Sequence, residues 1–270
     1  MALKLKGEIM GYSSRDYFSV TEQRSGRATR EQLERLYHRY RLAATFAEEK
    51  DVLEVGCGCG FGLGYLARRA KKVVGGDIDE KNIASALKYY RGRDDIEILQ
   101  LDAHELPFNN NSFDLVVLFE SIYYLENPDK FIAEARRVLR DDGILIVCTV
   151  NPLWEDFHPS KYSVYYYSTE ELYEMLERHF GLVELYGAFY VGKKGIKDKI
   201  TSALKRMASK LNLIPGSLRA RELLKRVFIG ELSPMPNEVY EDMAIYHEPK
   251  PIIKGYLCKD FKIIYAVARK

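Results

Sequence analysis

One glycine-rich stretch constrains the fold of this chain more than any other feature. Residues 51–64, DVLEVGCGCGFGLG, begin with a short apolar run and then place glycine at every second position from Gly56 to Gly64. The following residues, 65–69, have a helical pattern, so the stretch predicts a strand, a tight turn and a helix. Glycines let the backbone approach a ligand closely, and a helix N-terminus offers unpaired N–H groups. The turn therefore predicts a binding site.

Strands and helices alternate along the rest of the chain. Capping patterns mark several helix starts: Thr29 with Gln32, Ser168 with Glu171, and Asp79 before residue 80. We predict an α/β fold with a doubly wound, mostly parallel sheet of seven strands. The predicted strands are 51–55, 72–77, 96–101, 113–119, 144–150, 182–190 and 261–268, and the main predicted helices are 30–48, 65–69, 80–91, 128–143 and 169–180.

Four segments divide the chain in this interpretation. Residues 1–50 form an N-terminal arm and helix, and residues 51–191 form the ligand-binding core. Residues 192–260 form a basic helical insert or lid that the sheet does not require, and residues 261–270 supply the last core strand. The arm and the insert are expected to close over the site.

Composition describes an ordinary globular protein. The 270 residues are 47% hydrophobic and 30% charged, which excludes a disordered chain. No apolar run approaches the roughly 20 residues of a membrane span, and the first residues lack the apolar core of a signal peptide. The four cysteines include no C-x-x-C pair, so we expect free thiols and a cytoplasmic location.

Two ligands compete for the glycine turn, a dinucleotide and S-adenosylmethionine. A dinucleotide requires G-x-G-x-x-G at the turn, and this spacing fails from both Gly56 and Gly58. Glu54 also places a carboxylate immediately before the turn, where it would repel a pyrophosphate and attract an ammonium group. The residues therefore favour a cationic ligand.

Four motifs in succession strengthen this interpretation: VLEVGCGCG, VVGGD, LDAHELPFNNNSFDLVV and RVLRDDGILIV. They resemble the motifs of class I S-adenosylmethionine-dependent methyltransferases of the type 11-like group, over about residues 51–150. The resemblance implies a Rossmann-like methyltransferase fold, an enzyme, and S-adenosyl-L-methionine as the cofactor.

The resemblance also implies roles for residues around the methionine and the ribose. Glu54, Gly56, Cys57 and Gly58 would surround the methionine part of the cofactor. Asp77 would accept hydrogen bonds from both ribose hydroxyls, a geometry that suits a carboxylate at a strand end. A helix cap is the alternative role for Asp77.

The adenine and the reacting methyl group are assigned in the same way. Ile78 would pack on the adenine, Asp102 would accept from its amino group, and the Ala103 N–H would reach a ring nitrogen. Phe119 and Glu120 would border the methionine and the transferred methyl group. Asp102 could alternatively be a turn residue.

A catalytic base is needed only if the acceptor is a hydroxyl that must lose a proton. Many relatives have Glu-His in the pattern E-x-L-E-H after the fourth strand, but Tyr124 stands where the histidine would be. His158, in an aromatic loop, is the alternative base. Each residue also has a non-catalytic interpretation: Tyr124 can line the wall of the site, and His158 can be a surface residue. No His, Asp and Glu grouping has metal-ligand spacing, so we predict no metal.

The segments that would bind the methyl acceptor have less specific motifs than the cofactor site. The aromatic loop at residues 151–168 and the late insert resemble methyltransferases of glycan and surface-polysaccharide synthesis, and tyrosine and tryptophan rings suit a sugar. Residues 192–230 hold eleven Lys and Arg and two acidic residues, a net charge of +9, which suits phosphate or an anionic membrane. A lid or homodimer contact is the alternative role. We predict no nucleic-acid partner, since no binding motif accompanies the charge.

These observations predict methyl transfer to a small sugar-containing acceptor, a hydroxyl of a nucleotide- or lipid-linked glycan precursor. Two alternatives stay open: a non-catalytic S-adenosylmethionine-binding regulatory or partner protein, and a methyltransferase acting on another small molecule such as a quinone or a lipid.

Overall fold

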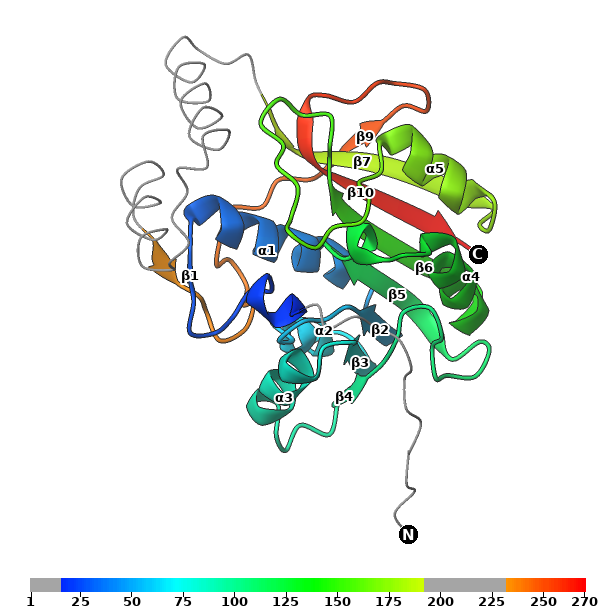
Figure 1. Ribbon diagram of the computed structural model, residues 1–270. Coiled ribbons are helices and arrows are strands. Elements are labelled where there is room, and N and C mark those ends of the chain that lie inside the picture. Colours follow the sequence, from blue (N-terminus) through cyan, green and yellow to red (C-terminus); the bar gives the residue numbers. More distant parts are fainter. Residues whose placement is uncertain (1–15, 192–231) are drawn as a thin grey trace.

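A computed structural model describes residues 16–191 and 232–270 (Figure 1). One eight-stranded sheet dominates it, with the strand order β4-β3-β2-β5-β6-β10-β7-β9. The glycine turn follows β2, which is central in this order. The strands are β2 (Asp51–Val55), β3 (Lys72–Asp77), β4 (Ile96–Gln100), β5 (Phe113–Phe119), β6 (Leu139–Val150), β7 (Leu182–Tyr190), β9 (Lys250–Ile252) and β10 (Phe261–Arg269).

The pairing confirms the predicted doubly wound α/β fold. β2 is parallel to β3 and β5, β3 to β4, and β5 to β6. β10 is antiparallel to both β6 and β7, and inserts between them. The predicted number of seven strands is one short, because residues 250–252 add β9 antiparallel to β7. This segment was missed because it is only three residues long and contains Pro251.

The predicted helix starts are confirmed. Thr29 and Ser168 each form a complete capping box, and the Asp79 carboxylate accepts from two backbone N–H groups of the next helix. The helix after Asn127 ends at Val138 rather than near residue 143, since β6 already begins at Leu139. The helices are α1 (Arg30–Ala44), α2 (Leu63–Ala67), α3 (Glu80–Tyr89), α4 (Pro128–Val138) and α5 (Thr169–Glu177), with the single turns η1 (Tyr17–Ser19) and η2 (Ile122–Tyr124).

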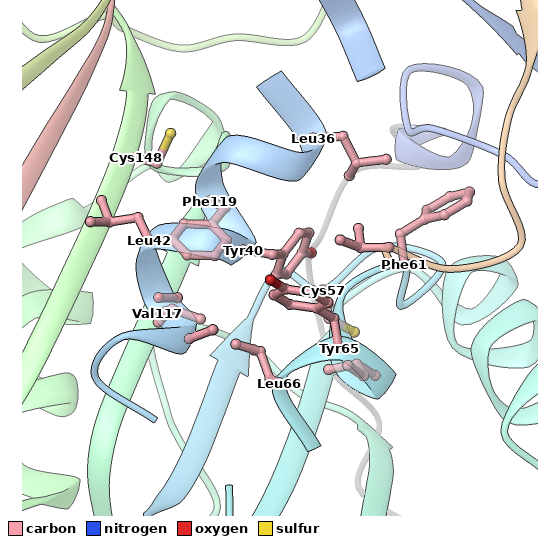
Figure 2. Close-up of a cluster of buried hydrophobic side chains, with 14 of the residues drawn as sticks. Leu36, Tyr40, Leu42, Cys57, Phe61, Tyr65, Leu66, Val117, Phe119 and Cys148 are labelled. Atoms are coloured by element: carbon pink, nitrogen blue, oxygen red, sulfur yellow. The ribbon is translucent and has the colours of Figure 1, made fainter. Parts of the chain in front are cut away.

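Apolar side chains fill both faces of the sheet. One buried cluster contains residues of α1 and α2, and the other contains residues of α4 and α5. In the first cluster, Tyr40 of α1 packs edge-on against Phe119 at the end of β5, with ring centroids 5.4 Å apart (Figure 2). All four cysteines are buried and free. The helix before the first core strand is therefore part of the core, and its residues reach the carboxyl ends of the strands.

The described part of the late insert, residues 232–260, runs beside the glycine turn. β8 (Ser233–Pro234) pairs with β1 (Arg27–Ala28) of the arm, and the Val239 N–H donates to the Phe61 carbonyl at 2.8 Å. This part contains no helix, so the predicted helical character does not extend to it. The basic residues 192–230, with the lid or dimer role predicted for them, lie outside the described residues. Within residues 16–191 and 232–270, no helix has the length and apolarity to cross a bilayer.

Candidate active site

A cavity of about 350 Å³ opens at the carboxyl ends of the parallel strands. This is the position where ligands bind in open α/β sheets. All ten residues predicted to hold the cofactor line it. Its walls come from the arm, α1, the glycine turn, the ends of β3, β4 and β5, and η2. The cavity is also lined by residues that the sequence analysis did not assign to the cofactor, which include Tyr17, Thr21, Glu22, Gln32, Arg35, Arg39, Tyr40, Asn82, His104, Ser121 and Tyr123.

The glycine turn forms the floor of the cavity. Gly56 has φ of +70°, and a Cβ there would lie 2.7 Å from the Ser121 hydroxyl oxygen. Gly58 has φ of +55°, and its N–H donates to the Asp77 carboxylate at 2.8 Å. Both conformations favour glycine. The turn thus brings the backbone within reach of a ligand and ties it to the end of β3.

Glu54 is the acidic group nearest the turn and is almost completely buried. The Tyr40 hydroxyl donates to its Oε1 at 2.6 Å, and its Oε2 is buried with no hydrogen-bond partner. Burial raises the pKa of Glu54 to about 8. A ligand that carries an ammonium group would favour the ionised form of this carboxyl, whereas a pyrophosphate would disfavour it.

Both carboxylate oxygens of Asp77, at the end of β3, accept hydrogen bonds. Its Oδ2 accepts from Gly58, while its Oδ1 accepts from the Asp79 N–H at 2.9 Å and from the Asn82 side-chain amide at 3.3 Å. Burial raises its pKa despite these donors. Asp79, and not Asp77, caps α3. The alternative role of Asp77 as the helix cap is therefore wrong, and its role toward a ribose remains a prediction.

His104 is a cavity residue that sequence reasoning missed. The Asp102 carboxylate accepts from the His104 N–H at 2.9 Å and from its Nδ1 at 2.7 Å, and His104 Nε2 accepts from the Asn127 N–H at 3.3 Å. The Nδ1 therefore carries the ring proton. These bonds fix the Asp102 side chain beside Ala103 in the cavity wall. The sequence signal for it is a histidine two residues after Asp102, directly after a predicted strand.

Glu120 follows β5 and is a half-buried carboxylate of the cavity. Its backbone has φ of +51°, which is unusual for a residue with a Cβ, and its N–H donates to the Cys148 carbonyl at 2.8 Å. The Tyr123 hydroxyl donates to its Oε2 at 3.0 Å. Burial raises the pKa of Glu120. A carboxylate with a left-handed backbone and a raised pKa, lining a cavity, is a candidate proton acceptor.

The two predicted catalytic residues differ in position. Tyr124 lines the cavity, and its hydroxyl hydrogen-bonds the Ser160 hydroxyl at 2.8 Å. Burial raises the pKa of Tyr124, which suits a neutral wall better than a base. His158 is exposed and is not among the residues that line the cavity. Its exposed position gives no support to the predicted role as base.

The arm crosses the cavity beside the glycine turn. Val20, Thr21 and Glu22 line the cavity, and the Arg24 guanidinium donates to the Cys59 carbonyl at 2.6 Å. Arg24 also stacks over the Tyr89 ring, 4.1 Å from its centroid. These contacts hold residues 16–28 against the site. Within the two described ranges, no cluster of three or more His, Cys, Asp or Glu side chains has the arrangement to hold a metal ion.

Comparison with known proteins agrees with this geometry. Residues 53–147 match the family model described as a methyltransferase domain. A probable S-adenosylmethionine-dependent methyltransferase of Mycobacterium tuberculosis is 38% identical over 112 residues, 42% of this chain and 40% of that protein. A fatty-acid O-methyltransferase of Mycolicibacterium smegmatis is 38% identical over 125 residues, 44% of each chain. The chain thus spans about two fifths of the length of these curated relatives.

Solved structures give the same fold. A SAM-dependent methyltransferase from Aquifex aeolicus is 25% identical, with a TM-score of 0.50 over 60% of this chain and 91% of that one. A possible histamine N-methyltransferase from Thermotoga maritima has a TM-score of 0.55 at 18% identity, over 88% of this chain and 92% of that one. This chain thus shares the fold of S-adenosylmethionine-dependent methyltransferases. Residues 53–147 of this chain match the methyltransferase domain, and this match supports S-adenosyl-L-methionine as the cofactor.

Proposed function

We propose that this protein transfers a methyl group from S-adenosylmethionine to an oxygen atom of a small-molecule acceptor. One observation carries the proposal: Glu54 in β2, Asp77 at the end of β3 and Glu120 directly after β5 line a single cavity. Glu54 and Asp77 would hold the ammonium and the ribose of the cofactor. Glu120 lies at the end of β5, where the resemblance puts the reacting methyl group.

The cofactor supplies a methyl group on a positively charged sulfur. In the proposed step the acceptor oxygen forms a bond to the methyl carbon as the sulfur–carbon bond breaks, and the electron pair stays on sulfur. A hydroxyl acceptor must also lose its proton, which Glu120 would take. The chain's own contribution is to orient both partners and to exclude water. The arm residues Val20 and Thr21 cover the glycine turn and support that exclusion.

A sugar hydroxyl is our first acceptor candidate. The cavity lining also includes a polar group from α1, Gln32, and aromatic rings from Tyr17, Tyr123 and Tyr124. Tyr17 and Tyr124 pack edge to face, with centroids 5.5 Å apart. Rings with polar handles beside hydrogen-bonding side chains suit a sugar. A nucleotide-linked or lipid-linked glycan precursor would present such a hydroxyl.

A lipid oxygen is the second candidate. Relatives over the matched part include a fatty-acid O-methyltransferase and a phthiotriol/phenolphthiotriol dimycocerosates methyltransferase of Mycobacterium leprae, the latter 34% identical over 119 residues. The ring wall that suits a sugar would also accept an acyl chain. Cytoplasmic location, membrane contact through the basic insert, and a homodimer remain proposals from the sequence.

The test is transfer of labelled methyl from S-adenosylmethionine to fractionated polar and lipid extracts, followed by mass spectrometry. We expect one labelled product that disappears with Glu120→Gln. The alternative of a non-catalytic binding protein predicts tight cofactor binding with no labelled product from either extract, and that result would end the enzyme proposal. Nucleotide sugars and fatty acids, added separately, then distinguish the two acceptor classes.

A further inference from the structure

The loop that joins β9 to β10 (Figure 1) exposes a cluster of large apolar side chains. Ile253 is 81% exposed, the highest fraction of any large apolar side chain in the described residues. Leu257 and Tyr256 are 59% and 51% exposed. Single exposed apolar side chains are ordinary on a protein surface, but a cluster of them marks a contact surface.

A tight turn gives this loop a fixed shape. The Tyr256 N–H donates to the Ile253 carbonyl at 3.1 Å, and Gly255 between them has φ of +81°. Glycine with positive φ at the third position of such a turn is typical of a type II turn. Directly after Leu257, the Cys258 side chain is fully buried, so the chain returns to the protein interior. The exposed residues are therefore the tip of an anchored turn.

Asn151 holds the base of this loop at the edge of the sheet that bears the cavity. It directly follows β6 and is fully buried, and its Nδ2 donates to the carbonyls of Cys258 at 3.0 Å and Phe261 at 2.8 Å. β6 is parallel to β5, whose last residue, Phe119, lines the cavity. The loop and the cavity thus lie at the carboxyl ends of neighbouring strands.

Lysines surround the apolar tip. Residues 249–259 contain Lys250, Lys254 and Lys259 and no acidic residue. Lys254 pairs with Glu177 at 2.8 Å, whereas Lys250 and Lys259 are exposed and form no ion pair within the part of the chain that the structure describes. Exposed apolar groups beside unpaired cations suit a bilayer with anionic headgroups, because the apolar side chains enter the interface while the lysines stay at the headgroups.

Charge argues against the two other occupants that the chain itself could supply. A two-fold contact with a second copy would place the same lysines against one another. Residues 192–230 carry a net charge of +9, so they would add repulsion and would not complement this surface. An anionic lipid surface is the occupant that the charge favours.

We propose that Ile253, Tyr256 and Leu257, with Lys250 and Lys259 beside them, dock this protein onto an anionic lipid surface. The inference goes beyond the proposed function and does not depend on it, because docking requires no methyl transfer. The docked protein turns the edge of the sheet that bears the cavity toward the bilayer. Docking therefore favours an acceptor oxygen that is carried by a lipid.

The first experiment measures binding of the full-length protein to unilamellar vesicles by co-sedimentation. Vesicles of phosphatidylcholine alone are compared with vesicles of phosphatidylcholine and phosphatidylglycerol in equal parts. We expect binding to the anionic vesicles to be stronger by roughly tenfold or more. Added salt should weaken it, because salt screens the attraction between lysines and headgroups.

Substitutions assign the binding to the loop. Ile253→Ser and Leu257→Ser should each weaken binding to anionic vesicles by about tenfold, the effect of withdrawing one apolar side chain from the interface. Lys259→Gln should weaken it by about fivefold. The matched controls are Leu182→Ser, at a half-exposed leucine that begins β7, and Lys71→Gln, just before β3, both at the opposite edge of the sheet. The controls should bind as the wild type does, and every variant should keep the wild-type Tm.

A fluorescent label reports which surface meets the lipid. All four native cysteines are buried, so Ile253→Cys and Leu182→Cys can each be labelled at one position with an environment-sensitive dye. On anionic vesicles the emission from position 253 should shift to the blue, and the emission from position 182 should not. Attachment through the basic residues 192–230 alone would bind the protein without the shift at position 253.

Three results would overturn the inference: no binding to anionic vesicles, binding that the combined Ile253→Ser and Leu257→Ser substitutions leave unchanged, or no shift at position 253. Self-association in sedimentation equilibrium that Leu257→Ser abolishes would assign the surface to a second copy instead. Failure of the proposed function is separate, since it appears as absence of methyl transfer in the extract assay whatever the vesicles show.

Discussion

Tyr40 of α1 donates a 2.6 Å hydrogen bond to Glu54 of β2, and both side chains are at most 2% exposed. The bond fixes one carboxyl oxygen and leaves the other, Oε2, without a partner. A helix that precedes the sheet thereby sets the orientation of the group proposed to receive the cofactor ammonium. Several properties of the site depend on this pair.

Cofactor binding should release a proton from Glu54. Burial raises the pKa of Glu54 to about 8, so below that pH the free protein holds this carboxyl neutral. An ammonium group beside it favours the charged form and lowers the pKa on binding. At pH 6.5 we expect S-adenosylhomocysteine binding to release close to one proton, measured by calorimetry in two buffers of different ionisation enthalpy. Glu54→Gln should release almost none; an unchanged release would show that another group titrates.

Glu54 should also destabilise the free protein at alkaline pH. The unfolded side chain ionises near a pKa of about 4.3, and the folded one near 8. Stability from this group is fully present below about pH 4 and is lost as pH rises toward and through 8. We expect the Tm of the wild type to fall by several degrees relative to Glu54→Gln between pH 5 and pH 8.5. Parallel Tm curves for the two proteins would contradict the buried pKa.

Gly62 should not tolerate a side chain. A Cβ there would lie 1.8 Å from the Tyr40 ring, which is held by Glu54 and packed against Phe119. The ring cannot withdraw without breaking the Tyr40 bond. We expect Gly62→Ala to destabilise the protein by about 1–3 kcal/mol, the usual range for overpacking, in urea unfolding. Gly181→Ala is the control, because a Cβ there meets nothing within 4 Å, and it should change stability much less.

Substitutions at Asp77 and Asn82 should distinguish a role of Asp77 in cofactor binding from a role in holding the glycine turn. The carboxylate accepts from Gly58, Asp79 and Asn82, and it is predicted to accept from the ribose as well. Charged hydrogen bonds are worth about 1.5–3 kcal/mol, which corresponds to roughly 10- to 100-fold in affinity. We expect Asp77→Asn to weaken S-adenosylhomocysteine binding by that factor. Asn82→Ala, which removes one of these donors but no ribose contact, should weaken it less. Equal losses would favour a purely structural role for Asp77.

If Glu120 is the general base, kcat should depend on its ionisation and therefore on pH. As a general base it must be ionised, so the rate with a hydroxyl acceptor should rise with pH through its raised pKa. Glu120→Gln should lower kcat by about 100-fold or more and flatten the profile. Tyr123→Phe removes a bond that stabilises the carboxylate, so the rise should move to higher pH. A Tyr123→Phe profile that does not move would assign the proton to another group.

Local signals determined most of the fold. The capping boxes at Thr29 and Ser168, the apolar strands and the glycine turn were each readable within a few residues, because they depend on propensities and hydrogen bonds between near neighbours. The strand β9 and the true end of α4 were missed. Both depend on pairing with distant strands, which short windows of sequence do not contain.

The residues proposed to bind the cofactor could also be predicted from local sequence patterns. Glu54, Asp77 and Asp102 each stand at the end of a predicted strand, and parallel strands bring their carboxyl ends to one edge. The sequence by itself therefore determined the sheet, the turn and the cofactor class. The tertiary structure alone decided which groups meet there: it joined Tyr40 to Glu54, brought Glu22 of the arm to Arg39, and left His158 outside the cavity lining, because these contacts depend on long-range packing.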